Sequence, residues 1–78
     1  MVEWRGARKR PVVIEYREVE PVVSFFDTRT GSVVKGEIIE TREGTLYARC
    51  GLDFVIKGVH DEVYPIEKVI FFETFDVL

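Results

Sequence analysis

Asp53-Phe54-Val55-Ile56-Lys57-Gly58 is the stretch that decides the fold, and Tyr64-Pro65 follows six residues later. Aromatic and β-branched side chains fill the middle of the stretch, which favours an extended strand. His60-Asp61-Glu62 is polar and short enough to turn the chain, so residues 63–66 are expected to return as a second strand. The stretch therefore predicts an antiparallel hairpin.

The middle of the chain shows further strands and turns of the same kind. Residues 12–20 alternate apolar and charged side chains with the period of two that is typical of a strand. Residues 32–41 also predict a strand, in which Gly36 is expected to form a bulge. Glu43-Gly44 is a candidate two-residue turn, because glycine adopts the positive φ that tight hairpins need. Residues 45–50 then predict the next strand.

Two segments fit both a helix and a strand. In residues 21–27, Val22, Phe25 and Phe26 lie at helical spacing, but the same side chains are strong β-formers. Residues 67–72 show a similar ambiguity. There we expect a short helical turn that is followed by a final strand.

The predicted fold class is α+β and mainly antiparallel. The connections are short, so strands that are consecutive in sequence are expected to pair with each other. A chain of 78 residues is long enough for one domain. We therefore predict a curled meander sheet or a partly open small barrel with one or two short helices. Residues 1–10 are expected to form a basic N-terminal arm, and residues 11–78 a single small globular domain.

The cysteine content and the hydropathy pattern bear on the compartment. Cys50 is the single cysteine, so no internal disulfide can form, which fits a reducing environment. No apolar run approaches the roughly 18 residues of a membrane span. The first residues, Met1 to Arg5, lack a hydrophobic signal segment. We therefore expect a cytoplasmic protein without a membrane partner.

Charge is distributed unevenly along the chain. The formal net charge is −3, yet residues 1–10 contain four cations and one acid, so the other residues form an acidic body. Basic residues next to an aromatic ring are typical of nucleic-acid binding, and an arm of this kind could contact phosphate groups. The other interpretation is a solvated tail. The candidate nucleic-acid-binding residues are Trp4, Arg5, Arg8, Lys9 and Arg10.

The sequence does not favour catalysis or metal binding. One cysteine and one histidine are too few for a metal site with the usual ligand spacing, so no metal and no cofactor is expected. Cys50 and His60 are the only pair that could form a thiol–imidazole centre, and a lone cysteine is more often a small core residue. The glycines are scattered and form no phosphate-binding loop. The protein is therefore predicted not to be an enzyme.

Lys57 is the most unusual residue of the predicted hairpin. Counted along the strand, it shares a face with Val55, whereas Phe54 and Ile56 share the other face. One interpretation is an edge charge in an ordinary hairpin that discourages aggregation. The other is a binding cleft beside the turn, next to the small residue at position 58. The candidate binding residues are Asp53, Lys57, His60 and Tyr64.

Three blocks of the chain resemble a family of small proteins encoded by phages and prophages. Lys9-Arg10-Pro11-Val12-Val13-Ile14-Glu15 is similar to the family's opening Lys-Lys-Pro-Val-Val-Ile-Glu. Ile39-Glu40-Thr41-Arg42-Glu43-Gly44 resembles its middle block. The last block resembles its Pro-Gly-Asp-Tyr-Ile-Ile-Lys-Gly segment together with the C-terminal residues of the family. The matching residues there are 53–59, Tyr64-Pro65, Ile70-Phe71 and Thr74-Phe75.

The resemblance implies a small accessory protein of viral or mobile-element type without a known catalytic centre. It marks Asp53, Lys57, Gly58, Tyr64 and Pro65 as positions of the family pattern. The chain departs from that pattern at Leu52, Asp61 and Lys68. Asp61 stands where the family has a turn glycine, and aspartate is among the residues that can adopt a positive φ.

The predicted function is a non-enzymatic binding or accessory module. Its partner would be another protein or a second copy of the chain, bound through an exposed sheet edge or through the surface around Lys57, His60 and Tyr64. The alternative is a nucleic-acid-binding module that uses the basic residues of the N-terminal segment.

Overall fold

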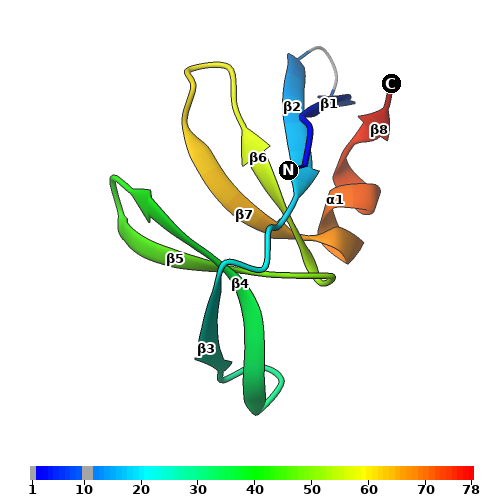
Figure 1. Ribbon diagram of the computed structural model, residues 1–78. Helices are drawn as coiled ribbons and strands as arrows, with labels where there is room; N and C mark the ends of the chain where they lie inside the picture. Colours follow the sequence, from blue (N-terminus) through cyan, green and yellow to red (C-terminus); the bar gives the residue numbers. More distant parts are fainter. Residues whose placement is uncertain (1, 10–11) are drawn as a thin grey trace.

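The computed structural model describes residues 2–9 and 12–78, and Figure 1 shows its arrangement. Within those residues the strands form two open antiparallel sheets, ordered β7-β6-β2-β1-β8 and β3-β4-β5, and close no barrel. The predicted α+β, mainly antiparallel class is confirmed. In chain order the elements are β1 (Arg5–Lys9), β2 (Val12–Glu18), β3 (Val23–Asp27), β4 (Ser32–Thr41), β5 (Gly44–Arg49), β6 (Asp53–Lys57), β7 (Val63–Glu67), α1 (Lys68–Thr74) and β8 (Asp76–Val77).

The predicted hairpin at residues 53–66 is the β6–β7 pair. Its register runs from Asp53 opposite Glu67 to Lys57 opposite Val63. In the turn, the Gly58 N–H donates to the carbonyl oxygen of residue 62 at 2.8 Å. Asp61 adopts a φ of 61°, a left-handed conformation that aspartate tolerates better than most residues.

Strand β6 is buried on both faces. Phe54 and Ile56 belong to a core cluster that α1 covers through Phe71. Val55 belongs to a second cluster, which the β3-β4-β5 sheet covers from the other side. The alternation predicted for this strand is therefore confirmed, and β6 is the centre of the molecule. The two clusters are Ala7, Ile14, Tyr16, Phe54, Ile56, Phe71 and Phe75, and Val19, Ile39, Ala48 and Val55.

Residues 21–27 contain a strand and not the helix that their spacing also allowed. In β3, Phe25 lies opposite Val34 and Phe26 lies opposite Val33 of β4. The Phe25 ring also packs against Tyr47, with ring centroids 5.0 Å apart. Pairing with β4 satisfies backbone groups that a single helical turn would leave open, so this tertiary contact decides between the two conformations. The second ambiguous segment does form a short helix, α1.

The predicted N-terminal arm lies partly within a sheet. Residues 5–9 form β1, which pairs along its length with β2 and at two positions with β8. Ala7 is fully buried in the first core cluster, which a solvated tail would not allow. The arm boundary drawn from charge alone is therefore wrong for residues 5–9, because the small side chain at position 7 is part of the core. Arg10 lies outside the described residues.

The turn between β4 and β5 is shifted by one residue from the prediction. Thr41 lies opposite Gly44, so the loop consists of Arg42 and Glu43. Gly44 follows the loop with a φ of 123°. Glycine therefore supplies the positive φ as expected, but at the first residue of β5 instead of inside the turn.

Gly36 lies where β4 changes partner. The strand pairs with β3 through residues 32–36 and with β5 through residues 36–41. A Cβ atom at position 36 would lie 1.8 Å from the backbone oxygen of Ala48. The backbone of β5 therefore approaches too closely for any side chain there.

We expect Gly36→Ala to destabilise the fold strongly, because the added methyl group meets backbone that cannot rotate away. Overpacking of this kind costs about 1–3 kcal/mol or more in free energy of unfolding. Urea denaturation should show the loss as a lower midpoint. Gly6→Ala is the matched control, because its Cβ would meet Leu78 at an ordinary 3.6 Å. Equal midpoints for the two variants would contradict the close approach.

Candidate functional site

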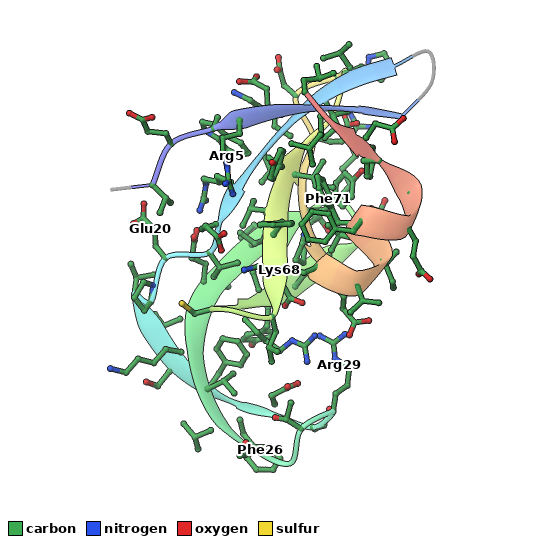
Figure 2. All side chains as sticks on the ribbon, turned by 90° about the vertical axis from the view of Figure 1, so that its right-hand side faces the viewer. Arg5, Glu20, Phe26, Arg29, Lys68 and Phe71 are labelled. Atoms are coloured by element: carbon green, nitrogen blue, oxygen red, sulfur yellow. The ribbon has the colours of Figure 1, made fainter. Side chains whose placement is uncertain are left out.

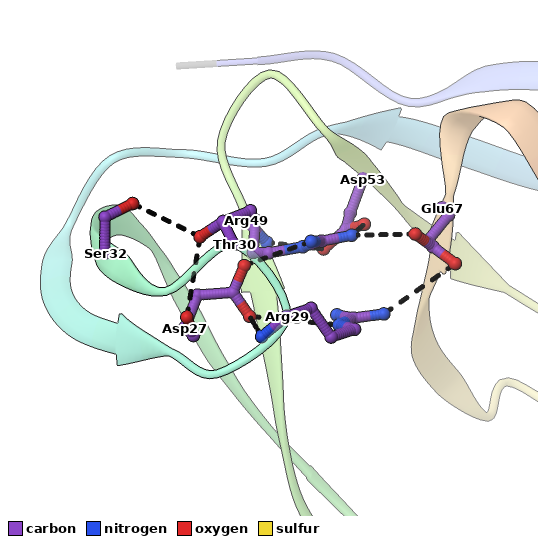
Figure 3. Close-up of polar contacts among 7 residues, drawn as sticks. All are labelled: Asp27, Arg29, Thr30, Ser32, Arg49, Asp53 and Glu67. Carbon is purple, nitrogen blue, oxygen red and sulfur yellow. Dashed lines mark hydrogen bonds and ion pairs between the residues drawn. The ribbon is translucent and has the colours of Figure 1, made fainter.

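Arg49 joins four strands through its guanidinium group (Figure 3). Its Nε and Nη2 donate to the two carboxylate oxygens of Asp53 at 3.0 and 2.9 Å. Nη1 donates to Asp27 at 3.1 Å, and Nη2 also donates to Glu67 at 3.1 Å. The backbone N–H of Arg49 donates to Asp53 as well, at 2.7 Å. These residues come from β3, β5, β6 and β7, so the contacts link both sheets.

Hydrogen bonding and burial act in opposite directions on the pKa values of Arg49 and Asp27 in this network. Hydrogen bonds to Asp53 raise the pKa of Arg49, although burial opposes the charged form. Burial by itself would raise the pKa of Asp27, but the hydrogen bonds from Arg49 and from the Arg29 N–H lower it overall. Among the described residues, no buried side-chain nitrogen or oxygen lacks a hydrogen-bond partner. The network is therefore a closed set of charges that holds the sheets together.

A groove lies beside this network. Arg29 stands at its rim with a side chain 55% exposed, 3.8 Å from both Asp27 and Glu67. The acidic groups of the groove are already engaged by Arg49 or Arg29. It therefore offers neither a general base nor a metal ligand set of its own. Residues that line it include Phe25, Arg29, Tyr47, Pro65, Ile66 and Glu67.

The predicted binding residues do not converge on one site. The Lys57 ammonium lies 4.9 Å from the centroid of the Trp4 ring and 3.5 Å from a carboxylate oxygen of Glu15. Tyr64 lies opposite Ile56 and packs against the first core cluster, so its side chain is on the other face of the sheet. His60 is exposed in the turn. Asp53 is buried and accepts hydrogen bonds from Arg49.

His60 and Tyr64 do line a common hollow between the β4–β5 and β6–β7 turns, but Lys57 is not among its lining residues. The backbone N–H of His60 donates to a Glu62 carboxylate oxygen at 3.0 Å. Burial raises the pKa of Tyr64, and the charge of Glu62 raises it further. Both effects keep the phenol protonated and disfavour its use as a base.

The basic residues proposed for nucleic-acid binding are engaged within the fold where the structure describes them. Trp4 packs against the second core cluster, and Arg17 lies 5.1 Å from its ring centroid. The Arg5 guanidinium lies 4.7 Å from the centroid of the Tyr16 ring and forms an ion pair with Glu18 at 3.4 Å. The side chains of Arg8 and Lys9, and the whole of Arg10, lie outside the described part of the chain.

Catalytic and metal-binding groups are not brought together by the fold. Cys50 lies in the turn before β6 and His60 in the turn after it, so the two stand at opposite ends of that strand. Over residues 2–9 and 12–78, no cluster of three or more His, Cys, Asp or Glu residues could hold a metal ion. None of the helices in that part of the chain is long and apolar enough to cross a membrane.

The β3–β4 hairpin carries an exposed apolar surface. Phe26 lies opposite Val33, and Val22 immediately precedes β3. The exposed fractions of Phe26, Val33 and Val22 are 63%, 68% and 64%, respectively. We call Val22, Phe26 and Val33 the hairpin face. Figure 2 shows Phe26 at the end of the molecule opposite Phe71.

The neighbouring side of the same strand is packed. Phe25 contacts Tyr47, and Asp27 is buried against Arg49. Strand β3 is also an edge strand of its sheet, as is β5. The hairpin therefore combines an apolar face with an open strand edge, which is the geometry that strand-adding partners use.

Sequence reasoning missed most of this arrangement. Asp27, Arg49 and Glu67 were not singled out, because their partners lie far apart in sequence and carry no common motif. The spacing of Arg49 and Asp53 across a glycine-containing turn was the one local signal of an ion pair. Phe26 was noted only as part of an ambiguous segment.

Comparison with known proteins adds no relative: no protein family matches this chain, and no curated protein or solved structure matches it.

We expect Arg49→Met to lower the free energy of unfolding by about 3–5 kcal/mol, because buried carboxylates would lose their counter-charge. Arg49→Lys should cost less, since it keeps the charge but not the forked geometry. Urea titrations would measure both. Arg29→Met removes only an exposed partner and should cost no more than about 1 kcal/mol. A loss for Arg49→Met as small as that of the control would refute the role of the network.

A second ion pair, between Arg17 of β2 and Glu37 of β4, predicts the response to acid. Arg17 donates to both carboxylate oxygens of Glu37, one of them at 2.8 Å, and the N–H of Glu20 donates to it at 2.7 Å. The hydrogen bond from Arg17 is the main reason why the pKa of Glu37 lies below its ordinary value of 4.5. The unfolded chain therefore takes up this proton first as the pH falls.

The stability contributed by Glu37 should be complete above about pH 5 and be lost as the pH falls through its lowered pKa. Glu37→Gln should therefore be less stable at neutral pH, by about 1–3 kcal/mol, and should lose less stability on acidification. Urea midpoints measured across this pH range test both effects. Glu43→Gln, in an exposed turn, is the control. An unchanged acid slope in Glu37→Gln would show that the pair does not set the pH response.

Proposed function

We propose that this protein is a small non-enzymatic module that binds another protein chain through the β3–β4 hairpin. One observation carries the proposal: the hairpin face is about two-thirds exposed and adjoins β3, a strand that ends its sheet. Apolar surface of this kind, beside an open edge, is typical of a recognition surface in a soluble domain. The sequence resemblance supports an accessory protein of phage or mobile-element type, and the single cysteine supports action in the cytoplasm.

The energetics favour a partner that covers both the hairpin face and the open edge of β3. Burial of a Val or Phe side chain contributes about 1.5–3 kcal/mol, so three such residues can support specific binding once the entropy of association is offset. An added strand would also satisfy the outer backbone groups of β3. Leu46 and Tyr47 on the other edge strand, β5, are less exposed, at 40% and 47%, and Val69 on α1 adjoins no strand edge.

Photo-crosslinking from the hairpin tests this function. A photoreactive phenylalanine analogue at position 26 should give a discrete protein adduct in the cells that make the protein. The same analogue at Val69, which is 73% exposed, is the control and should give none. Phe26→Ser is expected to fold with unchanged stability, since the ring is exposed. When the photoreactive analogue is placed at position 33 of this variant, the protein adduct should disappear. Equal adduct patterns from positions 26 and 69 would refute the proposal.

A further inference from the structure

Residues 22–26, which include most of the edge strand β3, have an apolar pattern that is symmetric about Ser24. Val22 and Val23 precede this serine, and Phe25 and Phe26 follow it. Side chains alternate between the faces of a strand, so positions 24 and 26 of β3 lie on one face and positions 23 and 25 on the other. Val22 precedes the strand, and its N–H donates to the Gly36 carbonyl oxygen of β4 at 3.1 Å, so it stays beside the sheet. A second copy of the strand, running antiparallel, therefore meets a pattern that matches its own.

The geometry of a two-fold axis limits the register. A two-fold axis perpendicular to a continuous sheet keeps each face on its own side, so directly opposed residues of the two copies must share a face. Their sequence positions then differ by an even number, and the register is centred on a residue instead of between two residues. A centre at Ser24 places Val22 opposite Phe26 of the second copy, and Val23 opposite Phe25. A centre at Phe25 would place Val23 opposite the buried Asp27, which Arg49 already holds. A centre at Val23 would place Glu20 opposite Phe26. The Ser24 register alone sets apolar residues opposite apolar residues on both faces.

We propose that the partner of the hairpin is a second copy of this chain, paired β3 to β3 in an antiparallel register centred on Ser24. The two β3-β4-β5 sheets then form one six-stranded sheet, and the two hairpin faces become continuous. This inference rests on the proposed function and names the occupant of its surface. Cross-strand aromatic and β-branched pairs are the contacts that stabilise such a register.

Charge does not oppose this pairing. Ser24 is flanked on β4 by the exposed Lys35. In the paired sheet the two Lys35 residues are three strand spacings apart, about 14 Å, where salt screens their repulsion. The Ser24 register also places a residue opposite Asp27, namely Pro21. Pro21 precedes β3, so this pair lies outside the paired strand, whereas the Val23–Asp27 pair of the Phe25 register would lie inside it.

Charge substitution at Ser24 tests the register. The unmodified protein should sediment as a dimer. Ser24→Lys and Ser24→Glu each place like charges directly opposite one another and should weaken self-association by roughly tenfold or more. An equimolar mixture of the two should restore the dimer. Position 24 is exposed but lies opposite Lys35 of β4, so circular dichroism and a urea titration of the monomer check that each variant keeps the fold. A monomeric unmodified protein at millimolar concentration, or no rescue in the mixture, would overturn the inference.

Disulfide trapping provides a second test that does not depend on charge. Directly opposed residues of an antiparallel pair have Cα atoms about 4.5–5.5 Å apart, within the range of a disulfide. In a background with the exposed Cys50 replaced by serine, Ser24→Cys should oxidise to a covalent dimer. Lys35→Cys, on the same face of the next strand, should not. Equal oxidation of the two variants would overturn the register.

The proposed binding function and the inference that the partner is a second copy can be refuted independently. If the chain is monomeric and position 26 crosslinks to a protein of another mass, the hairpin is a binding surface but a second copy is not its partner. If position 26 gives no specific adduct and the chain is monomeric, the proposed function itself is wrong.

Discussion

The buried guanidinium of Arg49 is the constraint on which the arrangement of the two sheets depends. The hydration free energy that a buried charge loses must be offset by an opposite charge and by hydrogen bonds, or the folded state is strongly destabilised. Asp53 meets it from the next strand, while Asp27 and Glu67 meet it from strands distant in sequence. The relative position of β3, β5, β6 and β7 is therefore set by one side chain as well as by the apolar clusters.

The same contact explains why the β3–β4 hairpin has two unlike faces. Asp27 is buried against Arg49, and Phe25, two residues earlier, packs against the half-exposed ring of Tyr47. Alternation then directs Phe26 and Ser24 outward. A residue that stabilises the interior thus determines which side chains are available for recognition. This link between core and surface is the structural basis of the proposed binding module.

Local patterns predicted the β6–β7 hairpin and the two faces of β6, because each depends on neighbours within a few residues. The predicted site around Lys57 illustrates the limit of such patterns. Lys57 and Tyr64 lie near one turn in sequence, but the register of the pair sends them to opposite faces. The N-terminal segment shows the same limit, since its charge suggested an arm whereas Ala7 is in the core.

The amino-acid sequence alone determined the class of fold, the short antiparallel connections and the shortage of catalytic groups, since these depend on composition, spacing and turn chemistry. Tertiary structure decided the conformation of residues 23–27, the partners of Arg49 and the exposure of the hairpin face. Each of these depends on which distant strands meet, and burial of a charge or a ring is a property of the assembled sheets that no local pattern encodes.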